Sequence, residues 1–305
     1  MEIRIATRKS ELALWQARYV AGKLEALPGV TRVTLLPLST RGDEILDKSL
    51  QKIGGKGLFI KELEIAMQAG EADVAVHSMK DVPATMPEGF CIAAVLERAN
   101  PHDAFLSADG TKFSDLPYGA RIGSSSLRRQ AQLKALRPDV EVVALRGNVN
   151  TRLKKLADGD YDAIILASAG LERLGLHSHI TSEFEVDVML PAAAQGVVGI
   201  ECLESREDLC RIIAMLEDPT SKITTTAERA VAARLDANCQ SPVASFATID
   251  NDTLTIEALV ASPNGSRIIR ERVSGPLSNA GALGRLVADK LLAEGAGELL
   301  ALDGQ

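Results

Sequence analysis

A run of hydroxyl and guanidinium side chains lies near the middle of the chain, where residues 121–129 read Arg-Ile-Gly-Ser-Ser-Ser-Leu-Arg-Arg. The start of this run predicts a strand, and its serines predict that a helix begins near Ser125. Backbone N–H groups at a helix N-terminus attract anions, and guanidinium groups bind carboxylates and phosphates through paired hydrogen bonds. Arg128 and Arg129 therefore indicate a site for an anionic ligand, although a solvated helix face explains such residues about as often.

The same composition recurs at the next predicted strand-to-helix turn, where Arg146 and Arg152 flank Gly147-Asn148. Residues 121–155 contain nine Lys and Arg but only two acidic residues, in a chain whose net charge is -7. Aromatic residues, which stack on nucleic-acid bases, make up 3% of the chain. We therefore expect the ligand to be a compact polyanion and not a nucleic acid.

Two further residues have positions that suit chemistry. Asp81 follows an apolar strand predicted over 72–76, and α/β sheets bind ligands at the carboxyl ends of their strands. A carboxylate there, beside Lys80, suits proton transfer, and a helix-capping or turn aspartate is the alternative. Cys239 lies in a predicted loop, where a thiol can react, although a lone loop cysteine more often has no role.

Several classes of protein are disfavoured. Gly54-Gly55-Lys56-Gly57 resembles a phosphate-binding loop, but Leu58 stands where nucleotide hydrolysis requires a hydroxyl residue. The cysteines lack the close spacing of a zinc site or of a disulfide framework, so we expect no metal. They are Cys91, Cys202, Cys210 and Cys239. No secretory signal and no apolar run of membrane-spanning length are recognisable, so we expect a cytoplasmic protein.

Strands and helices alternate through the first part of the chain, which predicts an α/β fold with parallel or mixed sheets. The first unit has predicted strands at 2–7, 31–36 and 72–76, with helices from Ser10 to about Leu24 and over 56–67. A second unit of the same plan follows Pro101, with strands at 121–123, 140–145 and 162–167 and helices over 125–136 and 149–156. Ligands often bind in a cleft between two such lobes.

The remaining sequence predicts a return to the first lobe and then a third domain. The strand predicted over 197–202 is expected to return to the first sheet, and 205–236 is expected to be helical. Three strands (243–249, 253–261 and 267–273) and a helix (277–292) then predict a small α+β domain. We therefore expect three domains: residues 1–98 with 197–216, residues 99–196, and residues 217–305.

Six short motifs follow one another along the chain: Arg4–Ser10 (RIATRKS), Gly54–Phe59 (GGKGLF), His77–Asp81 (HSMKD), Gly123–Arg129 (GSSSLRR), Leu145–Asn148 (LRGN) and Cys239-Gln240. Together, and with matching intervals, they resemble the porphobilinogen deaminase (hydroxymethylbilane synthase) family over nearly the whole chain. The resemblance implies two lobes like those of periplasmic binding proteins, with mixed sheets, and a small C-terminal α+β domain. It also implies a monomeric, cytoplasmic transferase of tetrapyrrole biosynthesis.

In this family, four porphobilinogen molecules are deaminated and joined head to tail on a dipyrromethane cofactor, and hydrolysis then releases hydroxymethylbilane. The resemblance implies that Cys239 holds the dipyrromethane by a thioether bond and that Asp81 is the catalytic carboxylate. Each pyrrole carries an acetate and a propionate, which accounts for the arginines. The matching cofactor-binding positions are Lys80, Ser125, Ser126, Arg128, Arg129, Arg146 and Gly147. The matching substrate-binding positions are Arg8, Ser10, Arg152, Arg173 and Gln195.

Two positions depart from the family's pattern. Ala237-Asn238 precedes the loop cysteine where Gly-Gly is common, so the turn must form differently; asparagine tolerates a left-handed conformation better than alanine. Ala194 stands before Gln195-Gly196 where glycine is usual, which puts the flexibility of a hinge there in question.

Two other functions are compatible with the same residues. A two-lobed anion-binding protein would use the same arginines without catalysis. A hydrolase would use Cys239 as its nucleophile, but no histidine lies in a motif that would activate that thiol. Apart from the small-molecule substrate, we expect neither a nucleic acid nor a membrane as a partner.

Overall fold

The computed structural model describes residues 1–40 and 60–301. The glycine-rich turn predicted at 54–57 and the start of the helix predicted over 56–67 lie outside the described residues. The chain divides into two compact units, Met1–Ala99 with Val197–Lys222, and Asn100–Gly196 with Ile223–Gln305. The second unit therefore contains both the second α/β lobe and the C-terminal sheet.

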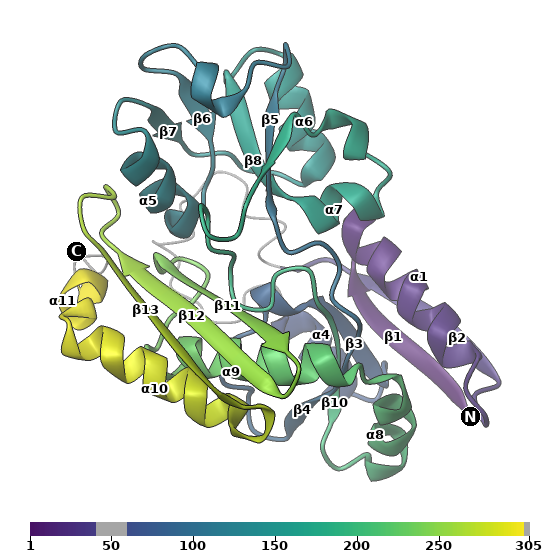
Figure 1. The fold of residues 1–305 in the computed structure, drawn as a ribbon. Helices are drawn as coiled ribbons and strands as arrows, with labels where there is room; N and C mark the ends of the chain where they lie inside the picture. Colours follow the sequence, from purple (N-terminus) through teal and green to yellow (C-terminus); the bar gives the residue numbers. More distant parts are fainter. Residues whose placement is uncertain (41–59, 302–305) are drawn as a thin grey trace. The chain divides into compact units, whose positions relative to one another are not determined.

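The first unit is built on a five-stranded mixed sheet of order β2-β1-β3-β10-β4 (Figure 1). Its strands are β1 (Glu2–Arg8), β2 (Arg32–Leu38), β3 (Val74–Ser78), β4 (Phe90–Val95) and β10 (Val198–Leu203). β1 runs parallel to β2 and β3, whereas β10 runs antiparallel to both of its neighbours, β3 and β4. The chain thus returns to the first sheet through β10.

Helices cover both faces of this sheet. α1 (Glu11–Glu25) and α8 (Glu207–Ile213) pack on the face that carries Ile5. α4 (Lys61–Gln68) packs on the opposite face, which carries Ala6. Because successive residues of a strand point to opposite faces, a sheet that is covered on both sides requires strands that are almost entirely apolar, as β3 is up to its last two residues.

The second lobe repeats this plan in a sheet of order β7-β6-β8-β5-β9. Its strands are β5 (Asp103–Ser107), β6 (Arg121–Gly123), β7 (Glu141–Val143), β8 (Ala163–Ala167) and β9 (Ser182–Phe184). β6 is parallel to β7 and β8, and β5 is antiparallel to β8 and β9. One face is covered by α5 (Leu127–Leu136), and the other is covered by α6 (Val149–Ala157) and α7 (Ser168–Arg173).

The C-terminal sheet packs against α5, the helix that carries Arg128 and Arg129. Its antiparallel strands are β11 (Val243–Asp250), β12 (Thr253–Ala261) and β13 (Ile268–Pro276). They share a core with α9 (Pro219–Arg234), α10 (Ala280–Ala293) and α11 (Ala296–Ala301). Figure 1 shows the sheet and these helices. A smaller cluster joins Ala131 of α5 to Ala244 and Leu259 of the sheet. Gly265 lies so close to α5 that a Cβ atom there would be 2.4 Å from the Ala131 carbonyl oxygen.

The fold class expected from the sequence is confirmed, because two mixed α/β sheets and a small sheet-and-helix domain are present. One element differs from its prediction, since 205–236 is not a continuous helix: α8 ends at Ile213 and α9 begins at Pro219. Proline suits the first turn of a helix, where its missing N–H leaves no partner unsatisfied. Asp218 marks the break by accepting a hydrogen bond from Ser221 N at 2.7 Å. No helix in the described part of the chain is long and apolar enough to cross a membrane.

Candidate functional site

Four of the predicted site residues lie at one edge of the first sheet. Asp81 and Lys80 follow the carboxyl end of β3 in a single 3-10 turn, where Asp81 is exposed and Lys80 is half-buried. Arg8 ends β1, which is parallel to β3, so its backbone reaches the same edge. Ser10 follows as the N-cap of α1, as predicted. Asp81 is the last residue of its turn, and the next element along the chain is the strand β4, so Asp81 caps no helix of the described residues.

Polar contacts hold the end of β3 in place beneath Asp81. His77 Nε2 lies 2.7 Å from Glu201 Oε2 of β10, and both residues are buried. Ser78 Oγ accepts a hydrogen bond from Gln16 Nε2 of α1 at 2.9 Å. His77 and Ser78 are thus hydrogen-bonded to neighbouring elements. These bonds fix the end of β3, from which the turn that carries Asp81 begins.

Met79 fixes the same turn by packing. It is 1% exposed, and its N–H donates to Val197 O at 3.0 Å. Its side chain lies over Gly199 of β10, so closely that a Cβ atom on Gly199 would be 2.1 Å from Met79 Sδ. The absence of a side chain at Gly199 therefore sets where Met79 lies, and with it the position of the two residues that follow.

Glu64 of α4 brings a second carboxyl group near the His77–Glu201 pair. Burial, and next the negative charge of Glu201, raise the pKa of Glu64 to about 7. One carboxyl oxygen of each, Glu64 Oε1 and Glu201 Oε1, is buried without a hydrogen-bond partner. The half-buried carboxyl group of Glu64 therefore changes its protonation near neutral pH.

Arg128 and Arg129 lie in the first turn of α5, whose N-cap Ser126 accepts a hydrogen bond from Arg129 N through its Oγ at 3.4 Å. They do not lie on a solvated helix face, because they are 3% and 6% exposed. Both guanidinium groups bind Asp103 of β5. Arg128 Nη1 donates to Asp103 Oδ2 and Arg129 Nη2 donates to Asp103 Oδ1, each at 2.6 Å. The sequence motif thus forms a buried ion cluster.

Asp103, which sequence reasoning missed, is the centre of this cluster. Burial alone would raise the pKa of Asp103, but the charges and hydrogen bonds of Arg128 and Arg129 offset that effect and hold it well below its usual range. The carboxylate is therefore ionised. Among the described residues, two guanidinium groups bind this one carboxylate, and Arg128 Nε is buried without a hydrogen-bond partner. The cluster therefore places two buried arginines around a single described carboxylate.

Gln195 and Arg173 hold the neighbouring backbone. Gln195 is buried, and its Nε2 donates to Pro101 O at 2.6 Å and to Asp103 Oδ1 at 3.2 Å. Arg173 Nη2, at the end of α7, donates to Gly196 O at 2.7 Å. Gln195 thus contacts the Asp103 cluster directly, whereas Arg173 binds the backbone of Gly196, the residue that follows Gln195.

The second arginine-bearing turn follows β7 and is linked to the first. Gly147 has φ +110°, a conformation that favours glycine, and its carbonyl oxygen accepts from Arg152 Nε at 2.7 Å. Ser125 Oγ, in the first turn, donates to Leu145 O at 2.9 Å. Arg146 follows Leu145 and is half-buried. The two turns therefore meet at the carboxyl edge of the second sheet, as the sequence predicts.

Cys239 is exposed in the turn between α9 and β11 and forms no disulfide. Asn238 shapes this turn, because its Oδ1 accepts from Gln240 N at 2.8 Å and its N–H donates to Ser241 Oγ at 3.1 Å. Asp236 has a left-handed conformation, with φ +50°, whereas Asn238 does not. The left-handed residue of this turn is therefore Asp236, which precedes Asn238 by two positions.

The other departure from the family's pattern also shows in the backbone. Ala194 is left-handed, with φ +59°, a conformation that costs a residue with a side chain about 1 kcal/mol. Its N–H donates to Oε2 of buried Glu228 at 2.6 Å, and Glu228 Oε1 accepts from Ala247 N of β11. Glu228 thus ties this strained position to the C-terminal sheet.

The sequence matches two family models, which together cover most of the chain. Residues 3–211 match the dipyrromethane cofactor-binding domain of porphobilinogen deaminase, and residues 222–293 match its C-terminal domain. The chain belongs to the porphobilinogen deaminase family. It is 53% identical over 300 residues to the porphobilinogen deaminase of Chromobacterium violaceum, which covers 98% of this chain and 97% of that protein. The chain is therefore a transferase of tetrapyrrole biosynthesis with a dipyrromethane cofactor-binding domain, and a non-catalytic binding protein is the weaker reading.

Similar solved structures are more distant. The VFT2 domain of BvgS from Bordetella pertussis is 14% identical, with a TM-score of 0.43 over 70% of this chain and 86% of that chain. A TRAP periplasmic solute-binding protein from Desulfovibrio salexigens is 12% identical, with a TM-score of 0.43 over 71% of this chain and 72% of that chain. The family assignment rests on the sequence matches.

Proposed function

We propose that three groups of residues have separate roles in the porphobilinogen deaminase reaction of this chain. Asp81 carries out the proton transfers, the arginines hold carboxylates, and Cys239 carries the dipyrromethane through a thioether bond. The observation that carries this proposal is the pair of buried guanidinium groups in the first turn of α5, where Arg128 Nε has no hydrogen-bond partner. A ligand that presents an acetate and a propionate on every ring would supply carboxylates for such groups.

The residues of the second unit fit a dipyrromethane group. Cys239 is exposed, so its thiol can take a large substituent without displacing any core residue. The Asp103 cluster contains two guanidinium groups and a buried donor, Arg128 Nε, without a hydrogen-bond partner. When bound, the group supplies the pyrrole carbon to which the first substrate is joined. Its carboxylates would be held by Lys80, Ser125, Ser126, Arg128, Arg129, Arg146 and Gly147.

Asp81 is placed to exchange protons with the substrate. The amine of porphobilinogen leaves as ammonia, which requires a proton, and its departure places positive charge on the pyrrole. A new carbon–carbon bond then forms from a pyrrole ring carbon to the methylene carbon that lost ammonia, and that ring carbon must lose its proton. The exposed carboxyl group of Asp81 can donate the first proton, and the carboxylate that results can stabilise the positive charge and accept the last proton.

The proposed substrate-binding residues recognise the acetate and propionate of each incoming porphobilinogen. They are Arg8, Ser10, Arg152, Arg173 and Gln195. Gln195 would act through the Asp103 cluster, because its side chain is buried against that carboxylate. Four such additions, followed by attack of water, would release hydroxymethylbilane.

The organisation of the chain follows from the same proposal. The functional domains would be residues 1–98 with 197–216, residues 99–196, and residues 217–305. We expect the enzyme to act as a cytoplasmic monomer and to need neither a metal ion nor a nucleic-acid or membrane partner for this reaction.

The intact mass of the purified protein tests the attachment site. We expect the wild-type mass to exceed that of the bare chain by two pyrrole units, and the Cys239→Ser variant to have the bare mass. Cys91→Ser is the matched control, because it removes a different thiol, and it should keep the adduct. An adduct that persists in Cys239→Ser would overturn the proposal.

A further inference from the structure

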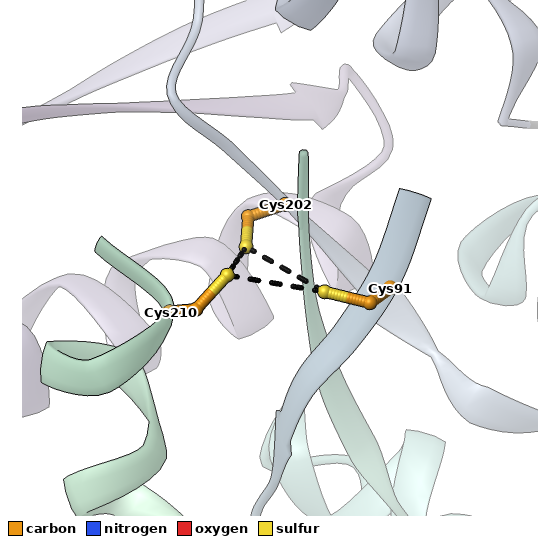
Figure 2. A group of neighbouring side chains, drawn as sticks. All are labelled: Cys91, Cys202 and Cys210. Atoms are coloured by element: carbon orange, nitrogen blue, oxygen red, sulfur yellow. Dashed lines mark hydrogen bonds between the residues drawn. The ribbon is translucent and has the colours of Figure 1, made fainter. Parts of the chain in front are cut away.

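Three cysteines that are far apart in the sequence meet in the first unit (Figure 2). Cys91 lies on β4, Cys202 on β10 and Cys210 on α8. Cys202 Sγ and Cys210 Sγ are 2.9 Å apart, and each lies 3.9 Å from Cys91 Sγ. Figure 2 shows the three side chains converging from three separate elements, and none of them forms a disulfide. The sequence spacing, which led us to expect no metal, conceals this group because strand pairing and helix packing create it.

The triangle of sulfur atoms has nearly the size that a three-coordinate metal site requires. With metal–sulfur bonds of about 2.3 Å, three ligands in a plane around one ion lie about 4.0 Å apart. Both distances from Cys91 Sγ have nearly this value. The remaining distance, between Cys202 and Cys210, would need to widen by about 1 Å, and Cys210 lies on a short helix at the edge of the unit.

The surroundings of the triangle favour a soft ion. Cys202 is completely buried, and Cys91 and Cys210 are half-buried against the same apolar core, which leaves a route of entry. Among the described residues, no histidine or carboxylate completes the group. Sulfur ligands alone favour Cu(I) over ions that prefer oxygen, and a structural Zn(II) site normally has four protein ligands.

We propose that Cys91, Cys202 and Cys210 form a binding site for one soft monovalent cation, Cu(I), held by three sulfur ligands where β4, β10 and α8 meet. Copper keeps its oxidation state on binding, and each thiol that becomes a thiolate releases its proton to the solvent.

Binding at this site would stabilise the first unit. An ion that binds only the folded state adds its binding free energy to the free energy of unfolding. The ion would fasten α8 to β10, the same strand that supports Met79 through Gly199 and His77 through Glu201. The site is independent of the proposed reaction, since none of the three cysteines has a role in it.

A competitive titration of the full chain with Cu(I) tests this proposal. The protein is purified with a reductant and without metal, and Cu(I) is supplied in the presence of a chromogenic Cu(I) chelator. We expect the wild type to bind one Cu(I) with three sulfur neighbours in its X-ray absorption spectrum. The Cys239→Ser variant, which removes the exposed thiol of the second unit, should bind it equally well. Cys210→Ala should weaken binding by more than about tenfold.

Folding of the variants is checked by circular dichroism without metal, and Cys91→Ala replaces Cys210→Ala if the latter does not fold. Three results would overturn the proposal. These are equal Cu(I) affinity in the wild type and in Cys210→Ala, tighter binding of Zn(II) than of Cu(I), and a Cys202–Cys210 disulfide that forms under the reductant and prevents binding.

Discussion

Asp81 and the pair Arg128–Arg129 occupy similar places in two sheets of the same plan, but in opposite environments. Each follows the carboxyl end of a strand that has a parallel neighbour, β3 in one lobe and β6 in the other. Asp81 is exposed above a buried support, whereas the arginines are themselves buried around Asp103. A group that exchanges protons with a substrate must be reachable, while groups that hold charge act more strongly when water is excluded. The two lobes differ accordingly.

Neutralising Asp103 should have the largest effect on stability and would test the arginine half of this comparison. Asp103→Asn keeps the shape of the side chain but removes the negative charge that both buried guanidinium groups bind. Breaking a buried ion pair in this way costs about 3–5 kcal/mol. We expect the free energy of unfolding, measured by urea titration, to fall by that amount.

The control for Asp103→Asn removes an exposed carboxylate from the same unit. Asp158 pairs with Lys154 at the surface, so Asp158→Asn should change the free energy of unfolding by less than about 1 kcal/mol. Equal losses in the two variants would show that the buried cluster is no more important than a surface pair.

Gly199→Ala should have the next largest effect, and it probes the support beneath Asp81. The new methyl group would collide with buried Met79, and overpacking of this kind costs about 1–3 kcal/mol. Because the turn would shift, we expect turnover to fall as well, by roughly 100-fold for a displacement near 1 Å. Gly22→Ala in α1, where a Cβ atom meets open space, should leave turnover unchanged and raise the free energy of unfolding by about 0.5–1 kcal/mol, since alanine favours a helix over glycine. Wild-type turnover in Gly199→Ala would contradict a supporting role for Met79.

Glu64→Gln should have the smallest effect, one that depends on pH. The pKa of Glu64 is raised from 4.5 to about 7 in the folded state, so the unfolded chain loses this proton first as pH rises. The wild type should therefore lose stability between about pH 4.5 and pH 7, and the glutamine variant should not. At pH 8 we expect the variant to be more stable by roughly 1 kcal/mol, because solvent screens part of the effect. If the free energy of unfolding depends on pH in the same way in both proteins, Glu64 does not cause the loss of stability.

Local signals in the sequence predict most elements of the fold. Ser10 caps the helix expected after it, and Ser126 caps α5, which begins at Leu127 where the sequence predicts a start at Ser125. Such caps form because a serine side chain can reach the free N–H groups of the first turn. The break between α8 and α9 also has a local signal, Asp218-Pro219, which the long apolar pattern of 205–236 obscures. Such signals can be recognised in the sequence because the capping residue and the helix end that it stabilises lie within a few residues of each other.

The partners inside the site are not readable in this way. Asp103 begins an apolar strand, and an acidic residue there is a weak signal for an ion pair, but its arginines come 25 and 26 residues later. The three cysteines of the first unit are assembled by β10, which crosses back from beyond the second lobe. Contacts of this kind depend on how distant strands pair. That pairing cannot be read from local patterns in one sequence.

The central claim is that holding and reacting belong to different residues, and mass spectrometry of two variants tests it directly. Arg128→Met and Asp81→Asn are purified, and their intact masses are recorded before and after porphobilinogen is added. The account predicts that Asp81→Asn carries the two-pyrrole adduct but gains no further rings and loses nearly all turnover, whereas Arg128→Met lacks the adduct. Addition of rings to Asp81→Asn at a near-normal rate, or a full adduct on Arg128→Met, would contradict the account.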